Sequence, residues 1–126
     1  MSRLIASLFV TLVLAAGSAG AASAHAALRH AHPSAGEELA VTPVEISIEY
    51  TTGVDLTQAE IHLTDSSGAE IALAKPEGET ATGETLVRRI STALAPGTYA
   101  VRWRVLSIDG HWTRGDYTFV VTAGGQ

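Results

Sequence analysis

Apolar and polar residues alternate in steps of two along much of the chain. Residues 44–50 place Val44, Ile46, Ile48 and Tyr50 on one side and polar residues between them. Residues 99–105 repeat the scheme with Tyr99, Val101, Trp103 and Val105. This alternation predicts strands that bury one face and leave the other in water, with Trp103 in the core.

Seven such segments, separated by turn signals, predict an all-β sandwich of about seven strands. We expect the strands at residues 27–31, 44–50, 59–64, 70–74, 85–90, 98–107 and 116–122. Turns rich in Gly, Pro, Asp and Ser are expected at residues 33–36, 65–68 and 95–97. The polar stretch 75–84 predicts a mobile loop.

The first residues have the pattern of a secretory signal peptide. Arg3 precedes an apolar stretch over residues 4–16, and Ala22-Ser23-Ala24 has the small-residue form of a cleavage site. A membrane anchor is the alternative, but the apolar stretch is shorter than the roughly 20 residues that a span needs. We expect residues 1–24 to be a cleaved signal peptide and residues 25–126 to be one periplasmic or secreted domain that starts at His25.

Composition excludes several kinds of site and partner. The chain has no cysteine, so neither a disulfide nor a thiolate metal site is available. Its net charge is −5, and the basic residues are interspersed with acids, which argues against a nucleic-acid partner. After residue 24 no apolar run reaches membrane length, so the mature form is not expected to be embedded in a membrane.

Three residues far apart in the sequence suggest a metal site. An amino-terminal His25 would offer both its amine and its imidazole to one ion. Asp109 and His111 follow the longest expected strand and belong to the loop before the last one, where alternate residues point the same way. Nitrogen and oxygen donors of this kind suit Cu(II). The spacing alone is a weak signal, because a loop histidine is more often simply solvated.

The same residues carry a resemblance to a known family. The mature start His25-Ala-Ala-Leu28, the phrase from Pro96 to His111 that ends Ser107-x-Asp109-Gly110-His111, and the ending Gly115-x-Tyr117-x-Phe119-x-Val121 resemble the CopC family of periplasmic copper-binding proteins. The resemblance spans nearly the whole mature chain. It implies a Greek-key, Ig-like sandwich that holds one Cu(II) ion per chain, with His25, Asp109 and His111 as ligands, and that is not an enzyme.

The chain also departs from the family pattern at three places. Met1 is its only methionine, so the Met-rich Cu(I) segment of some members is missing. Thr51 stands where some members have a Glu, which puts a further carboxylate ligand in doubt. Trp112 follows His111 where many members have Pro, and it would either shield the copper or cap the core.

The remaining histidines and two other function classes stay open at this stage. His30 and His32 would share one strand face and form an alternative metal pair, although solvated histidines explain them as well; His62 is expected to point outward without a metal role. The resemblance favours copper sequestration, resistance or delivery to a membrane copper transporter of the CopD type. The alternatives are a copper monooxygenase-like enzyme with an amino-terminal histidine brace, and a metal-free Ig-like interaction module.

Overall fold

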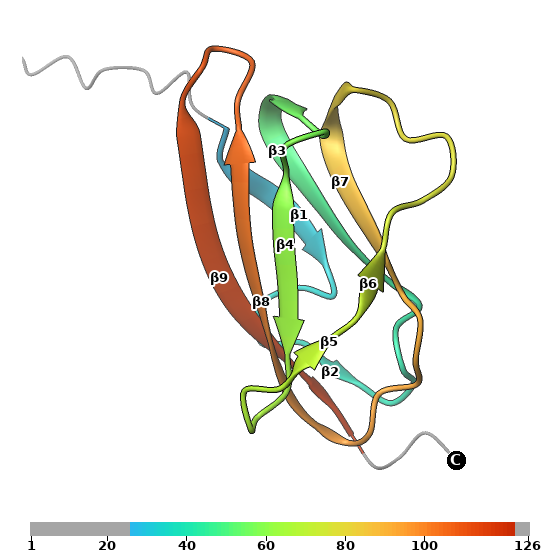
Figure 1. Cartoon of the computed structure of the whole chain (residues 1–126). Coiled ribbons are helices and arrows are strands. Elements are labelled where there is room, and N and C mark those ends of the chain that lie inside the picture. Colours follow the sequence, from blue (N-terminus) through green and yellow to red (C-terminus); the bar gives the residue numbers. More distant parts are fainter. Residues whose placement is uncertain (1–25, 123–126) are drawn as a thin grey trace, which may run out of the picture.

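The computed structural model describes residues 26–122, which form two β-sheets packed face to face (Figure 1). The first sheet has the order β1 (Leu28–His32), β3 (Glu45–Asp55), β7 (Thr82–Ile90) and β6 (Leu73–Ala74). The second has the order β2 (Glu38–Leu39), β9 (Trp112–Val121), β8 (Gly97–Leu106), β4 (Glu60–Thr64) and β5 (Glu70–Ile71). The predicted all-β sandwich is therefore confirmed. No helix that could cross a membrane occurs between residues 26 and 122.

The core lies between the two sheets and is built from the alternating residues of their central strands. Ile46, Ile48 and Tyr50 of β3 are buried, as are Val101, Trp103 and Val105 of β8. The rings of Tyr50 and Trp103 meet edge to face, with their centroids 5.1 Å apart. Gly115 is required beside this pair, because a Cβ there would lie 2.5 Å from the Trp103 ring. The inward position predicted for Trp103 is confirmed.

Several predicted boundaries differ from the structure. The strand predicted at 44–50 runs from Glu45 to Asp55, and Val44 lies outside it with 76% of its surface exposed. The segment predicted as one strand at 70–74 is two short strands, β5 and β6, which pair with different sheets. β7 begins at Thr82, so only residues 75–81 remain of the predicted loop, and β9 begins at Trp112 rather than at 116. The two-residue strand β2 was not predicted.

Two long strands bring the candidate ligands to one end of the sandwich. β8 and β9 pair in register over their whole length, from Gly97 opposite Val121 to Leu106 opposite Trp112. The loop between them, residues 107–111, lies at the same end as the start of β1 (Figure 1). The fold thus places the loop that contains Asp109 and His111 beside the amino-terminal edge of the described chain.

Candidate metal centre

The β8–β9 loop is a tight turn fixed by its own backbone. The Ser107 N–H donates to the His111 carbonyl at 2.9 Å, and the Gly110 N–H donates to the Ser107 carbonyl at 2.9 Å. Gly110 has φ = +89°, a left-handed conformation that glycine adopts at little cost. The turn therefore sets the relative position of residues 109 and 111.

Asp109 and His111 are brought together as the sequence predicts. The Asp109 Oδ1 lies 3.4 Å from the His111 Nδ1, and it also accepts the His111 backbone N–H at 3.2 Å. The His111 side chain is 62% exposed and that of Asp109 is 28% exposed. Hydrogen bonds, first from the Ser107 hydroxyl and then from His111, lower the pKa of Asp109 to about 2. An ionised carboxylate and an imidazole are thus presented side by side to solvent.

Ser107 supports this pair from inside the sandwich and is not among the residues predicted for the site. Its side chain is buried and its hydroxyl donates to the Asp109 Oδ1. The signal was available in the sequence: residues 99–105 alternate inward, and the next inward position is a serine rather than an apolar residue. A buried hydroxyl needs a partner, and here that partner is a candidate ligand.

The amino-terminal end of the described chain is held along β3. The Thr51 N–H donates to the Ala27 carbonyl at 2.9 Å, and the Thr51 Oγ1 accepts the Ala27 N–H at 3.1 Å. Two residues further along β3, the Gly53 carbonyl accepts the Ile108 N–H at 3.1 Å. Alternate residues of a strand direct their backbone groups to the same edge. Ala27 and Ile108 are therefore both bound at this edge of β3, to residues two positions apart.

The donors that the structure describes do not complete a metal site by themselves. Between residues 26 and 122 there is no group of three or more His, Asp or Glu side chains that could hold a metal ion. Asp109 and His111 supply one carboxylate and one imidazole. His25 and the predicted cleavage site after Ala24 lie outside the described residues. Thr51, which stands where some members have a Glu, accepts the Ala27 backbone N–H with its side chain.

The other histidines lie apart from this loop. His62 is exposed on β4, as predicted, and its Nδ1 contacts the Glu70 Oε1. His30 and His32 are both exposed on β1, and the His32 Nδ1 lies 4.0 Å from the Glu37 Oε2. Neither histidine of β1 belongs to a cluster of three potential ligands within the described chain.

Trp112 is on the surface and stacks with a neighbouring arginine. Its side chain is 41% exposed, and the Arg104 guanidinium carbon lies 3.9 Å from the centre of its ring. Trp112 was expected either to shield the copper or to cap the core, and this exposure does not fit a cap on the core.

The chain is similar to known proteins in both sequence and fold. A family model described as "CopC domain" matches residues 28–122. Copper resistance protein C of Xanthomonas campestris pv. juglandis is 31% identical over 121 residues, which cover 91% of this chain and 95% of that protein. Protein YobA of Escherichia coli K12 is 33% identical over 98 residues, covering 78% of this chain and 79% of that protein.

Solved structures agree with these sequence matches. The crystal structure of CopC from Methylosinus trichosporium OB3b superposes with a TM-score of 0.66 at 30% identity, covering 78% of this chain and 94% of that one. PcoC from Escherichia coli, described as a methionine-rich copper resistance protein, has a TM-score of 0.66 at 27% identity and covers 79% and 100%. The chain belongs to the CopC family, whose members are copper-binding resistance proteins rather than enzymes.

Proposed function

We propose that the mature chain begins at His25 and binds one Cu(II) ion through four donors. These are the α-amine and imidazole of His25, the imidazole of His111 and the carboxylate of Asp109. The observation that best supports this proposal is that the amino-terminal segment and the β8–β9 loop are bound to the same edge of β3. Thr51 binds Ala27 there, and Gly53 binds Ile108.

The donor chemistry favours Cu(II) over Cu(I). Imidazole, amine and carboxylate donors suit Cu(II), whereas Cu(I) selects thioether and thiolate ligands. The chain has no cysteine, and its single methionine, Met1, would leave with the signal peptide. It therefore differs from the methionine-rich PcoC. We expect tight Cu(II) binding, weaker Zn(II) binding and much weaker Cu(I) binding.

We further propose that the protein works in the periplasm or outside the cell and either sequesters copper or delivers it to a membrane transporter of the CopD type. Both sequestration and delivery need a copper ion that can be released from its site. The exposure of the His111 side chain, 62%, supports a site that is open to exchange. Membership of a family of resistance proteins argues against the oxidative-enzyme alternative.

The decisive experiment compares Cu(II) affinity of the protein that begins at His25 with that of a form carrying one extra methionine before it. The extra residue turns the amine into an amide and breaks the chelate. Loss of a ligand should weaken Cu(II) binding by more than the roughly 10–100-fold that is typical when a residue hydrogen-bonded to a ligand is replaced. Circular dichroism checks that both forms are folded. Equal affinity of the two forms would overturn the assignment of His25 and make His30 and His32 the better candidates.

The proposal also predicts a dependence on pH. Protons compete with copper for amine and imidazole nitrogens, so affinity should fall on acidification. The Asp109 carboxylate, with its pKa of about 2, stays ionised throughout and does not contribute to this fall. An affinity that is constant between about pH 8 and pH 5 would contradict a ligand set of amine and imidazoles.

A further inference from the structure

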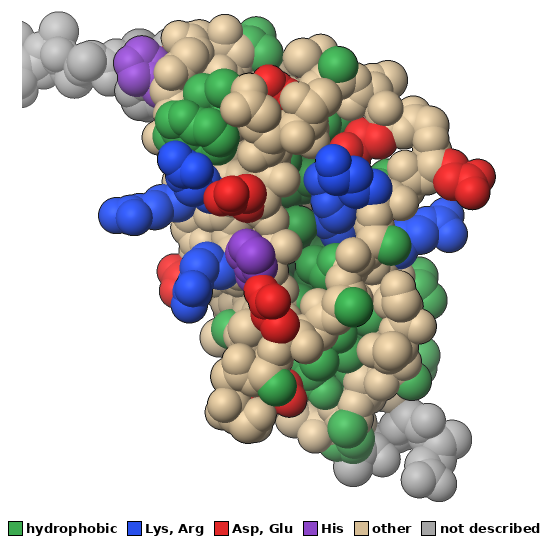
Figure 2. Space-filling view, in the orientation of Figure 1, with side chains coloured by type: hydrophobic (Ala, Val, Ile, Leu, Met, Phe, Trp, Pro, Cys, Tyr) green, Lys and Arg blue, Asp and Glu red, His purple; other side chains and the backbone are tan. Residues whose placement is uncertain are grey.

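Basic side chains gather on the outer face of the five-stranded sheet. Arg102 and Arg104 of β8 and Arg114 of β9 are all exposed there, and Figure 2 shows basic side chains over these strands beside a histidine and acidic side chains over β4. We call these three residues the arginine face. It stands out because the whole chain has a net charge of −5.

The arginine face places like charges where they do not stabilise the fold. Arg104 and Arg114 stand directly opposite each other in the β8–β9 ladder. Like charges in this position destabilise a pair of strands. Arg104 is partly compensated, because its Nη1 lies 3.6 Å from the Glu60 Oε2 and its guanidinium stacks on Trp112. Among the described residues, Arg114 and Arg102 make no ion pair within 4.0 Å.

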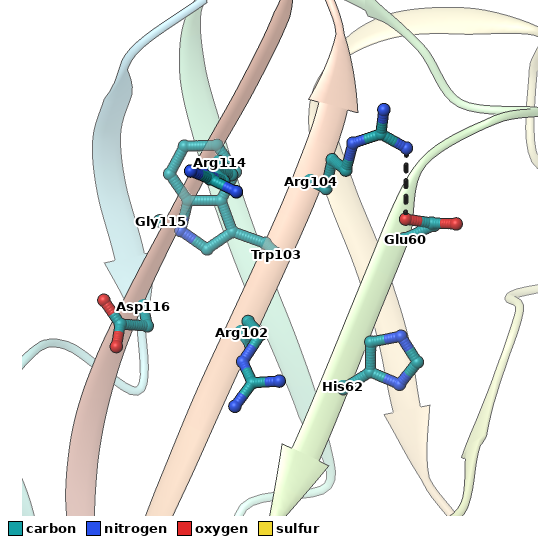
Figure 3. Close-up of a pocket in the computed structure, with 8 residues that line it drawn as sticks. All are labelled: Glu60, His62, Arg102, Trp103, Arg104, Arg114, Gly115 and Asp116. Atoms are coloured by element: carbon teal, nitrogen blue, oxygen red, sulfur yellow. Dashed lines mark ion pairs between the residues drawn. The ribbon is translucent and has the colours of Figure 1, made fainter.

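The three arginines line one hollow of about 510 Å³, together with Glu60, His62 and Asp116. Figure 3 shows Arg104 directed toward Glu60, Arg102 directed along the sheet away from it, and Asp116 lying on the far side of β9 from Arg102. Asp116 is the cross-strand neighbour of Arg102, yet it does not neutralise it. Two guanidinium groups are therefore available to an external anion.

We propose that the arginine face is a docking site for an acidic segment of a partner protein. Carboxylates of such a segment would bind Arg102 and Arg114 as charge-assisted pairs and relieve the repulsion between Arg104 and Arg114. A flat anionic membrane fits less well, because it would also meet Glu60, Asp116 and the negative charge of the whole chain. A narrow segment can align its carboxylates with the arginines and avoid those acids.

The site adjoins the loop of the candidate copper centre. Trp112, which stacks on Arg104, directly follows His111 in the sequence. A docked segment would thus lie beside the loop through which copper enters or leaves. The docking site itself does not depend on copper, and its test uses the copper-free protein, so a failure of the proposed metal function leaves the result interpretable.

The test is a binding titration of a fluorescein-labelled hexaglutamate peptide, with hexalysine as the control peptide. Three variants carry the same change of charge: Arg102→Glu and Arg114→Glu on the arginine face, and Arg89→Glu on the exposed side of β7 in the other sheet. We expect each arginine-face variant to bind the peptide about tenfold more weakly than Arg89→Glu, as loss of a charged hydrogen bond implies. Thermal unfolding serves as the check on folding.

A second readout separates a binding role from a structural one. Arg114→Glu places an acid opposite Arg104, so the variant should be at least as stable as the wild type while it loses the peptide. Equal loss in all three variants would mean non-specific attraction and would overturn the proposal. Absence of peptide binding would also overturn the proposal. If the protein instead bound vesicles of equal parts phosphatidylglycerol and phosphatidylcholine, the partner would be a membrane and not a protein.

Discussion

Ser107 is the residue on which the geometry of the candidate copper loop most depends. Its backbone N–H closes the turn on His111, and its buried hydroxyl donates to the Asp109 Oδ1. Residues that orient a metal ligand without touching the metal commonly affect affinity as much as a weak ligand does.

Replacing Ser107 by Ala should therefore weaken Cu(II) binding by about 10–100-fold. Ser91→Ala, an exposed serine in the loop before β8, is the matched control and should have no effect. Loss of the hydroxyl also alters the orientation of the carboxylate, so the electron paramagnetic resonance parameters of bound Cu(II) should shift in Ser107→Ala alone. An unchanged spectrum and affinity would restrict Ser107 to a structural role.

The proposed ligands should differ in their contributions to Cu(II) affinity. We expect His111→Ala to weaken Cu(II) binding more than Asp109→Ala, because an imidazole nitrogen is the better donor to Cu(II). Asp109→Ala also leaves the buried Ser107 hydroxyl without its acceptor, which should lower the free energy of unfolding by about 1–3 kcal/mol. Asp109→Asn keeps an acceptor and separates the two effects.

His62→Ala serves as the control for these ligand variants. His62 lies on β4 and contacts Glu70, away from the loop. Isothermal titration with Cu(II) should give an unchanged affinity for this variant. A loss comparable to that of His111→Ala would show that copper binds on the sheet face instead.

Among the elements, β3 connects the amino-terminal segment with the β8–β9 loop. The sequence predicted its buried alternation up to Tyr50 but not its continuation to Asp55, because Thr51, Thr52 and Gly53 carry no apolar alternation. Their role depends on backbone bonds to Ala27 and Ile108, which are long-range contacts. For the same reason the switch of the chain from β5 to β6 could not be predicted from residues 70–74.

Thr51→Val removes the side-chain acceptor of the Ala27 N–H while keeping the shape of the residue. The amino-terminal segment should be held less firmly, and Cu(II) affinity should fall by up to about tenfold, the equivalent of one hydrogen bond. Thr98→Val, an exposed position on β8, should leave affinity unchanged. Competition with a chelator of known affinity measures both variants; an effect of the same size at Thr98 would contradict the role of β3.

The β4–β5 turn makes the stability of the second sheet depend on pH. The Asp65 Oδ1 accepts the Ser67 hydroxyl at 2.6 Å, the Ser67 N–H at 2.9 Å and the Ala69 N–H at 3.0 Å. These bonds, the Ser67 hydroxyl first, lower the pKa of Asp65 below its usual 3.8. Its contribution to stability is therefore fully present above that value and is lost as the pH falls through the lowered pKa.

Asp65→Asn should consequently destabilise the protein at pH 7, and the difference from wild type should shrink in strong acid. Urea unfolding at neutral pH and again in strong acid, below the lowered pKa of Asp65, measures this. A destabilisation that is equally large at both pH values would show that the ionised form of Asp65 does not contribute.

At the scale of the whole molecule, scaffold and site were predictable to different degrees. The alternation of residues 99–105 and the turn signals were sufficient for the sandwich, since burial of one strand face leaves few other solutions. The pairing of Asp109 with His111 followed from their spacing in a loop. The buried position of Ser107 continues the alternation of residues 99–105, whereas the arginine face could not be predicted, because it depends on which strands pair.

Because the fold and the candidate copper site rest on different residues, we predict that the copper-free protein folds and that copper adds stability to an already complete fold. The core between β3 and β8 is closed by apolar residues, none of which is a candidate ligand. A ligand that binds only the native state stabilises it by about 2.7 kcal/mol at a free concentration one hundred times its dissociation constant. Calorimetry of the protein that begins at His25 should therefore show one cooperative transition without copper and a higher Tm with Cu(II). The form extended by methionine should show the same transition without copper but little shift with it. A copper-free protein without a cooperative transition would instead make the metal part of the fold.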